Sequence, residues 1–458
     1  MVRLFNVYYP TRMILLLVCE AIIVSSSFLI AAALVLGPNM YIAMNYEMGA
    51  QKIAGLTVLT ILCSYYFDLY APQRIPFHWE IYFRLLLVLG LLSFILAGGS
   101  YLFPKTAIGP NVFVLGLAVL TVALFAWRRA YEWIIGRSAF SERVYVLGCG
   151  ERAQQIVDAI GTRRDFGMEV VGWGGASGVH NNPVEDFASA LKRFRLGALQ
   201  IDRVIVALQD RRGAMPVREL LDIRLAGVNV EDAGSLLEKM SGKLQLEGLH
   251  PSALIFAEGF RVKPSQQFFR RIVSMLVSAT GLALCLPIIP FIALVVKLSS
   301  PGPILFRQNR VGLRGKCFVI YKFRTMGQDA EARGAVWAKK NDPRITRVGM
   351  FLRKTRLDEI PQLWNVLRGD MGFVGPRPER PEFVQWLADQ IPYYNLRHTI
   401  RPGLTGWAQV RYQYGASVEE TKQKLEYDLY YIKHMTSGLD LLIMFETIKT
   451  ILLRRGAQ

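Results

Sequence analysis

Four apolar runs near the N-terminus constrain this chain more than any other feature of its sequence. Each is long and apolar enough to cross the hydrocarbon core of a bilayer, which takes about 20 apolar residues in a helix. The first is too long for the core of a cleaved signal peptide, and no small-residue cleavage pattern follows it. We therefore expect a membrane protein in which residues 1–135 form a four-helix transmembrane bundle. The runs are Met13–Leu36, Ile53–Leu69, Leu85–Tyr101 and Val112–Trp127.

Basic residues predict the orientation of these segments. Arg12, Arg84 and Arg128 lie at ends that would share one side of the membrane, whereas the opposite loops contain little charge beyond Lys52 and Lys105. Segments on the cytoplasmic side of a membrane are enriched in Lys and Arg. The N-terminus and everything after the fourth run are therefore expected in the cytoplasm.

The charge balance of the whole chain limits the classes of molecule that it is expected to bind. The 54 Lys and Arg exceed the 36 Asp and Glu, which gives a formal net charge of +18. Such a surplus suits nucleic acid, an anionic lipid surface or phosphorylated substrates. No helix-turn-helix, zinc-finger or RNA-binding motif accompanies it, so we expect a lipid bilayer and phosphorylated substrates and no nucleic acid. The five cysteines lie far apart without a CxxC pair, so neither disulfides nor a cysteine-bound metal is expected.

Residues 141–250 alternate short β-rich runs with helical ones, as in RVYVLGCG, ERAQQIVDAI, MEVVGW and DRVIVALQD. This βαβ succession predicts a small α/β domain with a Rossmann-like parallel sheet. Gly148 and Gly150 follow the first strand, where glycine would let a cofactor phosphate approach the helix N-terminus. The third position of that glycine pattern is Ala153, and no acid follows the second strand to bind a ribose. A tight strand-to-helix turn that binds nothing, or an unidentified ligand, is the favoured alternative.

A fifth apolar run covers residues 272–296, with Arg270 before it and Lys297 after it. Both ends therefore prefer the cytoplasm. Pro287 and Pro290 remove two backbone donors within the run and disrupt a straight helix there. We expect a re-entrant helix-break-helix rather than a kinked full span, because a full span would leave the polar remainder of the chain outside.

Residues 265–458 are predicted to form a mainly α domain whose loops are dense in Arg, Gly and Pro. That composition is typical of segments that bind phosphate groups. A single surface arginine needs no function, but a basic set clustered beside the hairpin favours a diphosphate site. Its members are Arg310, Lys322, Arg324, Arg344, Arg347, Arg353, Arg356, Arg377 and Arg401.

Asp358 and Glu359 are the sharpest candidates for chemistry. They are expected to open a helix, on which neighbouring side chains project about 100° apart, one toward a phosphorus atom and the other toward a cation. An N-cap Asp followed by a Glu that compensates the helix dipole is the structural alternative. The helical apolar stripe that starts beside the acids, with Pro361 in its first turn, consists of Leu357, Ile360, Leu363, Trp364 and Leu367.

At these residues the chain closely resembles the bacterial sugar transferase family, the monotopic polyprenyl-phosphate phosphoglycosyl transferases. The resemblance covers about residues 268–454. It runs in order through SPGPILFRQNRVG, YKFRTM, NDPRITRVG, LRKTRLDEIPQLWNVLRGDM, VGPRPE, RPGLTGWAQV and YDLYYIK. The upstream spans and α/β domain are similar to those of the large members of this family, which initiate exopolysaccharide assembly. Leu286 and Gly372 depart from the family pattern, in which serine is usual at both positions.

The resemblance implies an enzyme of the bacterial inner membrane, with its catalytic domain on the cytoplasmic face. The Asp that matches Asp358 attacks the β-phosphorus of a UDP-sugar, releases UMP and holds the phosphosugar until polyprenyl (undecaprenyl) phosphate accepts it. Such a covalent intermediate divides one difficult displacement into two steps. Glu359 is the expected Mg²⁺ ligand and Arg377 the expected phosphate contact. Further candidates for substrate binding are Arg310, Lys322, Arg324, Arg353 and Arg401.

Two functions from other classes fit the sequence less well. A membrane-anchored nucleotide-sugar dehydratase or epimerase would need a full glycine fingerprint and a Tyr-x-x-x-Lys pair, and Tyr101 with Lys105 is predicted to lie outside. A non-catalytic scaffold of a polysaccharide export complex would bind anionic lipid through the basic tail, but it does not need adjacent carboxylates. A sheet domain without a cofactor would suit a dimerisation or regulatory surface, so a homodimer is one option, and the sequence leaves the oligomeric state open. The sequence does not predict the sugar or the polyprenol length.

Overall fold

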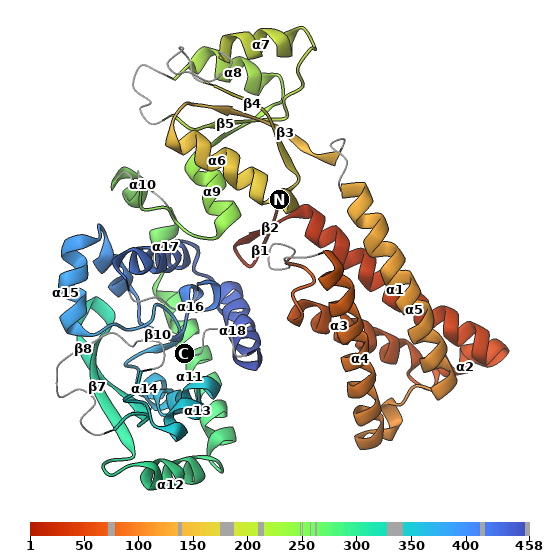
Figure 1. The fold of residues 1–458 in the computed structure, drawn as a ribbon, viewed down its shortest axis with the longest axis vertical. Coiled ribbons are helices and arrows are strands. Elements are labelled where there is room, and N and C mark those ends of the chain that lie inside the picture. Colours follow the sequence, from red (N-terminus) through yellow and green to blue (C-terminus); the bar gives the residue numbers. More distant parts are fainter. Residues whose placement is uncertain are drawn as a thin grey trace. The chain divides into compact units, whose positions relative to one another are not determined.

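The computed structural model describes residues 1–71, 78–135, 140–174, 187–208, 215–247, 249, 251–256, 258–261, 263–327, 342–412 and 417–453. Asn341, the first residue of the matched NDPRITRVG motif, lies outside these ranges. The chain forms two compact units (Figure 1). The first consists of Met1–Val2 and Tyr8–Leu236, and the second of Arg3–Val7 and Leu237–Gln458.

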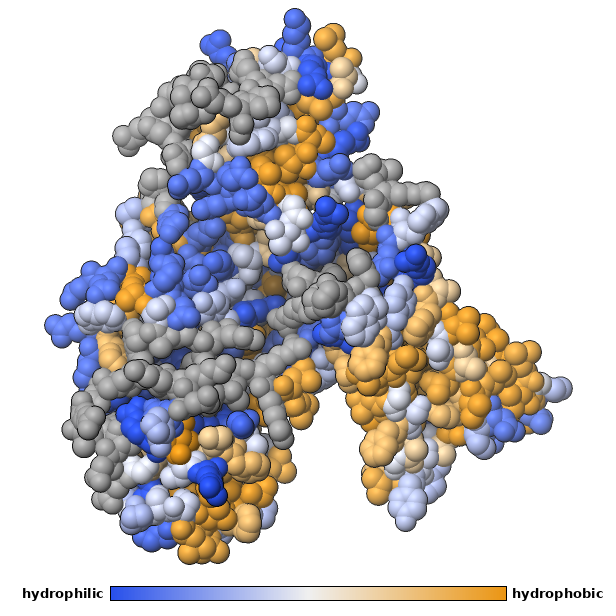
Figure 2. All heavy atoms as spheres, in the orientation of Figure 1, coloured by the Kyte–Doolittle hydropathy of each residue, from blue (hydrophilic) through white to orange (hydrophobic). Residues whose placement is uncertain are grey.

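Long helices form at all four N-terminal apolar runs. They are α1 (Thr11–Leu36), α3 (Gly49–Tyr66), α4 (His78–Leu102) and α5 (Pro110–Ile135), and a short α2 (Met40–Asn45) follows α1. By length and composition, Thr11–Asn45, Trp79–Leu102 and Pro110–Ile135 could each cross a membrane. The first turn of α3 contains Gln51 and Lys52, which make this helix less apolar, so its span stays a prediction. Figure 2 shows a broad apolar surface over these helices, as lipid contact would require.

The helices of this bundle enclose an apolar core and one buried ion pair. Gly116 of α5 admits the ring of Phe28, because an added Cβ there would lie 2.6 Å from that ring. Nε of Arg128 in α5 lies 2.5 Å from Oε1 of Glu20 in α1. Tyr70 donates to the other Glu20 oxygen at 2.6 Å. Arg128, which the flanking-charge pattern predicted to face the cytoplasm, is therefore paired inside the bundle, where an unpaired charge would be costly.

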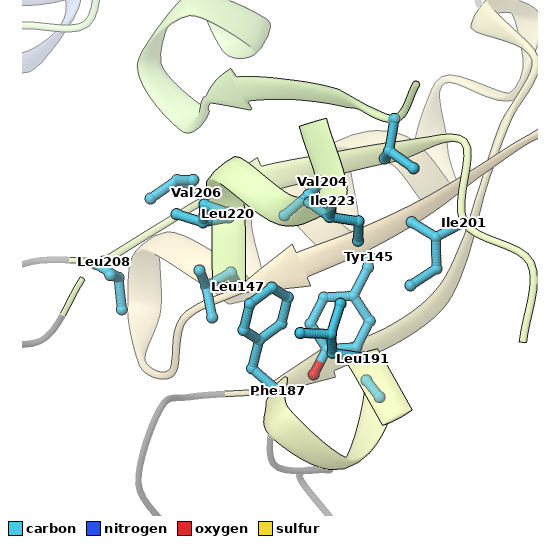
Figure 3. Close-up of a cluster of buried hydrophobic side chains, with 12 residues drawn as sticks. Tyr145, Leu147, Phe187, Leu191, Ile201, Val204, Val206, Leu208, Leu220 and Ile223 are labelled. Atoms are coloured by element: carbon cyan, nitrogen blue, oxygen red, sulfur yellow. The ribbon is translucent and has the colours of Figure 1, made fainter. Parts of the chain in front are cut away.

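The rest of the first unit contains a four-stranded parallel sheet, which confirms that part of the prediction. Its strands are β3 (Glu142–Leu147), β4 (Met168–Gly174), β5 (Arg203–Val206) and β6 (Asn229–Asp232), in the order β4-β3-β5-β6. Helices α6 (Glu151–Thr162), α7 (Phe187–Arg195) and α8 (Val217–Leu225) alternate with the strands. Figure 3 shows Tyr145 and Leu147 of β3 packed with Phe187 and Leu220 in a buried apolar cluster. The assignment of this sheet as Rossmann-like stays a prediction.

The two glycines of the predicted cofactor turn have local structural reasons to be glycine. An added Cβ at Gly148 would lie 2.7 Å from the carbonyl oxygen of Ala207, which follows β5. Gly150 has a φ of +98°, which L side chains rarely adopt, and it precedes the first residue of α6. A tight strand-to-helix turn therefore explains both positions, and their role in cofactor binding stays a prediction.

The second unit is mainly helical, with two small sheets. β7 (Leu305–Val311) and β8 (Cys317–Phe323) pair antiparallel, and β9 (Gly372–Val374) pairs parallel with β10 (Gly403–Thr405). α9 (Ala233–Ser241) leads into this unit. Its other helices are α10 (Pro251–Phe256), α11 (Pro264–Cys285), α12 (Ile289–Ser299), α13 (Arg347–Thr355), α14 (Gln362–Arg368), α15 (Pro381–Gln390), α16 (Trp407–Arg411), α17 (Val418–His434) and α18 (Ser437–Leu452).

Segments upstream of the family match belong to this second unit. The Asn6 amide donates to the carbonyl of His434 at 3.0 Å, so the N-terminal residues are bound at the end of α17. The indole of Trp407 donates to the carbonyl of Gly242 at 2.7 Å. Lys243 forms an ion pair of 2.8 Å with Glu426 in the middle of α17. The unit that contains the family motifs therefore includes residues that the motifs do not reveal.

The predicted helix-break-helix is present. α11 and α12 are separated at Leu286–Ile288, with Pro287 inside the break and Pro290 in the first turn of α12. The prolines have no N–H to donate. Leu286 and Ile288 instead donate three residues back, to Ala283 at 3.3 Å and to Cys285 at 2.9 Å. Figure 1 shows α12 turned across the end of α11.

Both ends of this hairpin are tied to the same unit. Arg270 at its start forms an ion pair of 2.6 Å with Asp440 of α18, and Arg271 donates to the carbonyl of Leu367 at 2.7 Å. At its far end, Arg324 donates to the carbonyl of Ser300 at 2.6 Å. These contacts fit a re-entrant hairpin, because residues at both of its ends bind parts of the same unit. α11 alone is long and apolar enough to cross a membrane, so re-entry itself stays a prediction.

Ser265 and Pro301 flank the hairpin and are exposed, so single cysteines at these positions test its topology. In a background without the five native cysteines, both should react with a membrane-impermeant maleimide only from the cytoplasmic side. A cysteine at Lys105, in the loop before α5, is the control that should react only from outside. Labelling of positions 265 and 301 from opposite sides would show a full span.

Candidate active site

Asp358 and Glu359 lie in a short 3-10 turn, Leu357–Glu359, between α13 and α14. The expectation that they open an α-helix is wrong, since α14 begins only at Gln362. The reason is Pro361, which has no N–H to donate to Leu357. The Leu357 carbonyl accepts instead from Ile360, three residues on, at 3.3 Å. The acids therefore project from a tight turn whose geometry the proline imposes.

The residue before this turn has an unusual backbone. Arg356 ends α13 with a φ of 57° and a ψ of 16°, in the left-handed region. For a residue other than glycine this conformation costs roughly 1–2 kcal/mol. It reverses the chain between the two helices, and Nη1 of Arg356 then lies 3.9 Å from Oε2 of Glu359. A strained residue beside two acids is typical of a functional site.

Glu359 is surrounded by positive charge. Nη2 of Arg377 donates to Oε1 of Glu359 at 2.7 Å, and Nζ of Lys322 lies 3.5 Å from the same oxygen. Burial opposes ionisation of Glu359, but the charges of Arg377 and Lys322 outweigh it and hold its pKa below the ordinary value. Glu359 is therefore ionised at neutral pH.

Asp358 has the opposite character. It is 7% exposed, and burial together with the negative charge of Glu359 raises its pKa to about 6. The charges of Lys322, Arg353 and Arg377 act in the other direction. Two adjacent carboxyl groups thus have pKa values shifted apart, an arrangement found where two acids perform different tasks.

Asn365 of α14 connects the helix that follows the two acids to the strand that contains Lys322. Asn365 is fully buried, and its amide donates to the carbonyl of Val319 at 2.7 Å and to Asp370 at 3.1 Å. Its oxygen accepts from the backbone N–H of Tyr321 at 3.1 Å. β8, which contains Lys322, is thereby fixed to the helix that follows the acids.

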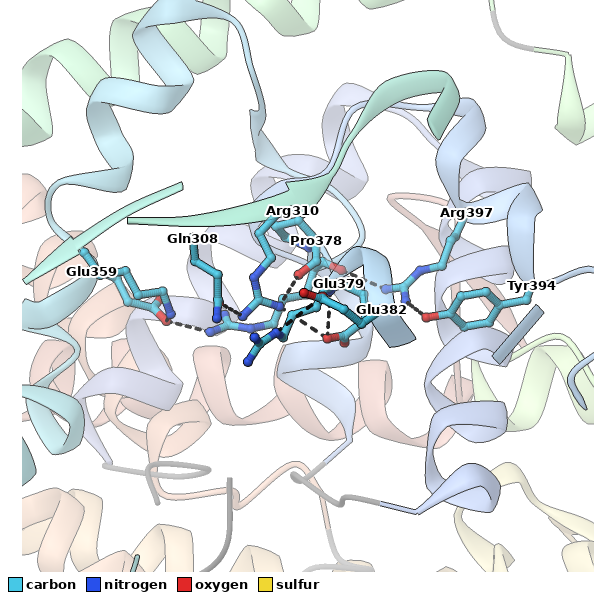
Figure 4. A network of polar contacts seen from close by, with 11 residues as sticks. Gln308, Arg310, Glu359, Pro378, Glu379, Glu382, Tyr394 and Arg397 are labelled. Carbon is cyan, nitrogen blue, oxygen red and sulfur yellow. Dashed lines mark hydrogen bonds and ion pairs between the residues drawn. The ribbon is translucent and has the colours of Figure 1, made fainter. Parts of the chain in front are cut away.

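Arg377 belongs to the loop between β9 and α15. Arg310 of β7 supports this loop, since it donates to the carbonyl of Pro378 at 3.1 Å and forms an ion pair of 3.2 Å with Glu379 (Figure 4). The structure therefore brings Lys322, Arg377 and the two acids together. Arg310 contacts the loop that presents Arg377, and it supports this group from behind the loop.

The remaining predicted basic residues lie in different places. Arg353 donates to the hydroxyl of Thr325 at 2.9 Å, and its charge acts on Asp358. Arg324 binds the C-terminal carbonyls of α12, so its described contacts serve the hairpin. Arg401 makes no hydrogen bond to either acid among the described residues. Phosphate binding by these residues stays a prediction.

An ion pair that the sequence analysis missed lies beside this loop. Nη2 of Arg397 is 2.9 Å from Oδ2 of Asp428 and also donates to the carbonyl of Arg377 at 2.9 Å. One signal could have revealed Asp428, which lies in α17 among the buried residues Leu425, Leu429 and Ile432. An acid on the apolar face of a helix needs a buried partner.

The chain is similar to known proteins over this region and beyond it. The model of the family described as "Bacterial sugar transferase" matches residues 265–454. A relative from Escherichia coli (strain K12), UDP-glucose:undecaprenyl-phosphate glucose-1-phosphate transferase, is 33% identical over 69% of each chain. The undecaprenyl-phosphate glucose phosphotransferase of Komagataeibacter xylinus is 31% identical over 78% of this chain and 72% of its own.

A third relative, from Aeromonas hydrophila, is named UDP-N-acetylgalactosamine-undecaprenyl-phosphate N-acetylgalactosaminephosphotransferase. It is 42% identical over 57% of this chain, and the match spans 62% of its own length. The two relatives that are covered over more than two thirds of their length show the family of this chain. It belongs to the bacterial sugar transferases, a family of polyprenyl-phosphate sugar phosphotransferase enzymes.

Proposed function

We propose that this chain transfers a sugar 1-phosphate from a UDP-sugar to undecaprenyl phosphate and so initiates a polysaccharide repeat unit. The observation that carries the proposal is the pair formed by the buried Asp358 and the adjacent, partly buried Glu359, whose pKa values are shifted apart beside Lys322 and Arg377. The names of the relatives support the two substrates. They name glucose and N-acetylgalactosamine, so the sugar of this chain is a question for experiment.

In the first step, a carboxylate oxygen of Asp358 attacks the β-phosphorus of the UDP-sugar. A bond forms between that oxygen and phosphorus, and the bond from phosphorus to the bridging oxygen breaks, so UMP leaves with the electron pair. Burial keeps Asp358 poorly solvated and therefore reactive, while its pKa of about 6 leaves it mostly ionised at neutral pH. Arg377 and Lys322 are placed to offset negative charge on the diphosphate.

In the second step, a phosphate oxygen of undecaprenyl phosphate attacks the same phosphorus atom. The bond to Asp358 breaks, which restores the carboxylate and gives undecaprenyl diphosphate sugar. Undecaprenyl phosphate is a membrane lipid, so the site has to lie near the bilayer surface. The apolar hairpin of the same unit supports that position, on the cytoplasmic face of the inner membrane.

Mg²⁺ fits this site only together with a substrate. Among the described residues there is no group of three or more His, Cys, Asp or Glu side chains that could hold a metal ion. Mg²⁺ is commonly bound by one or two carboxylates plus substrate phosphates, so Glu359 would hold it with the diphosphate. The ion would supply positive charge at the phosphoryl group. Arg377 and Lys322 are ion-paired with the Glu359 carboxylate in this structure. They would have to give up part of this pairing for Glu359 to bind the metal ion.

Asp358→Asn tests the nucleophile directly, because it keeps the shape of the side chain and replaces the nucleophilic carboxylate with a neutral amide. In the full-length protein, UMP release from a panel of UDP-sugars should fall on the order of 10³-fold or more. The unfolding midpoint should not fall, since the substitution removes a buried carboxylate whose raised pKa shows that its ionised form is disfavoured. A variant that keeps near-normal UMP release would contradict the covalent mechanism.

Glu359→Gln should fail in a different way. Loss of the charge should lower the rate and raise the Mg²⁺ concentration needed for half-maximal UMP release about tenfold or more. Glu382→Gln, at a side chain that is 60% exposed on α15, is the control and should leave both quantities unchanged. An unaltered Mg²⁺ requirement in Glu359→Gln would remove Glu359 as the metal ligand.

A further inference from the structure

The loop that presents Arg377 is fixed on both sides of that residue. Pro376 and Pro378 flank it, and proline restricts φ and removes the N–H. The carbonyl of Pro376 accepts from the N–H of Gly403 in β10 at 2.9 Å. The carbonyl of Pro378 accepts from Arg310 at 3.1 Å. The backbone on either side of Arg377 is therefore held by two different strands.

The carbonyl of Arg377 itself is held by a third element. Nη2 of Arg397, in the 3-10 helix Tyr394–Thr399, donates to it at 2.9 Å and lies equally close to Oδ2 of Asp428. Nη1 of Arg397 donates to the hydroxyl of Tyr394 at 2.8 Å. A planar guanidinium can hold these diverging acceptors at once, which an ammonium group cannot do in the same way. Figure 4 shows Arg397 between Tyr394 and this loop.

Burial makes this arrangement rigid. Arg397 is 8% exposed and Asp428 is 2% exposed, so little water can replace either partner. Asp428 belongs to α17, a 17-residue helix that contains many of the buried side chains of the unit. The other end of Arg377, its guanidinium, meets Glu359 at 2.7 Å. The side chain of Arg377 thus lies between a fixed backbone and the acid beside the proposed nucleophile.

We propose that Arg397 and Asp428 are positioning residues for the transfer reaction, and that their ion pair holds the main chain of Arg377 so that its guanidinium reaches Glu359 and the diphosphate. The proposal rests on the proposed function. Both residues act through Arg377, and neither is assigned a contact with the reacting atoms. A shift of the Arg377 backbone would misplace the charge that offsets the diphosphate, and misplacements of about 1 Å can cost 10²-fold in rate.

A purely structural role predicts a different pattern of effects. If the ion pair only stabilised α17, its loss would reduce activity by the same factor whatever residue stands at position 377. If it acts through Arg377, its loss should matter only while Arg377 is present. A double-mutant cycle separates the two cases.

The cycle combines Arg397→Lys with Arg377→Gln in the full-length protein, and UMP release gives kcat and KM for the UDP-sugar. Arg397→Lys keeps the charge and removes the fork, so kcat should fall about tenfold or more in the native background. In the Arg377→Gln background the further loss should be at most about twofold. Equal losses in the two backgrounds would overturn the proposal.

Asp428→Asn is a second variant for the same cycle, because it keeps the volume and one acceptor oxygen if Arg397→Lys folds poorly. It should show the same dependence on Arg377. Arg203→Lys is the matched control, since Arg203 is also a largely enclosed, ion-paired arginine, with Glu142 at 2.9 Å and Glu231 at 2.5 Å, but lies in the parallel sheet. Its effect on kcat should be small and equal in both backgrounds.

Hydrogen exchange gives a readout that does not depend on the reaction. The N–H of Gly375, at the start of the loop, donates to the carbonyl of Thr405 at 2.9 Å. In Arg397→Lys, exchange in peptides that cover residues 372–379 should become faster, whereas Arg203→Lys should leave it unchanged. Unchanged exchange in Arg397→Lys would overturn the positioning role. Absence of UMP release from the native protein would instead overturn the proposed function, and the exchange would still decide how Arg377 is held.

Discussion

The ionised carboxylate of Glu359, whose side chain is only 12% exposed, is the constraint on which the rest of this site depends. A carboxylate that is largely removed from water is stable only when positive charge surrounds it. The second unit meets this requirement with cations from three separate elements: Lys322 from β8, Arg356 from the end of α13 and Arg377 from the loop after β9. Two of these elements, β8 and the loop after β9, are fixed in turn by buried polar contacts of Asn365 and Arg397. Burial and the negative charge of Glu359 act against the ionised form of the neighbouring Asp358, and its pKa is raised to about 6 although nearby cations oppose this shift.

The hairpin and the acidic turn share one apolar core. Ile292 and Val296 of α12 pack in a cluster with Ile360 and Leu363, which directly follow the acids, and with Phe323 of β8. The residues that follow the acids therefore pack directly against a helix of the hairpin that is proposed to enter the membrane. Such a position suits a reaction between a water-soluble nucleotide sugar and a lipid phosphate, because both substrates have to reach the same phosphorus atom.

Local patterns in the sequence predicted much of this structure. The apolar runs, the break at Pro287 and Pro290 and the parallel sheet follow from periodicity and from proline chemistry within a few residues, and the structure contains all three. The motif resemblance identified the family, which the relatives confirm. The expected start of an α-helix at Asp358 is wrong, because Pro361 has no N–H to donate to the Leu357 carbonyl and the α-helix begins only at Gln362.

Contacts between distant segments could not be predicted in this way. Arg270 and its neighbour Arg271 precede an apolar run and therefore resemble membrane-flanking charges. In the structure, however, Arg270 binds Asp440 and Arg271 binds a carbonyl at the end of α14. Arg397 and Asp428 are 31 positions apart and share no motif that would pair them.

The central claim is that Asp358 becomes phosphorylated by the sugar phosphate. It is tested most directly by incubating the purified full-length protein with a UDP-sugar labelled in the sugar, without undecaprenyl phosphate, followed by peptide mass spectrometry. The account predicts a sugar phosphate on the peptide that contains Asp358, lost when undecaprenyl phosphate is added. UMP release only in the presence of the lipid, with no labelled peptide, would contradict it.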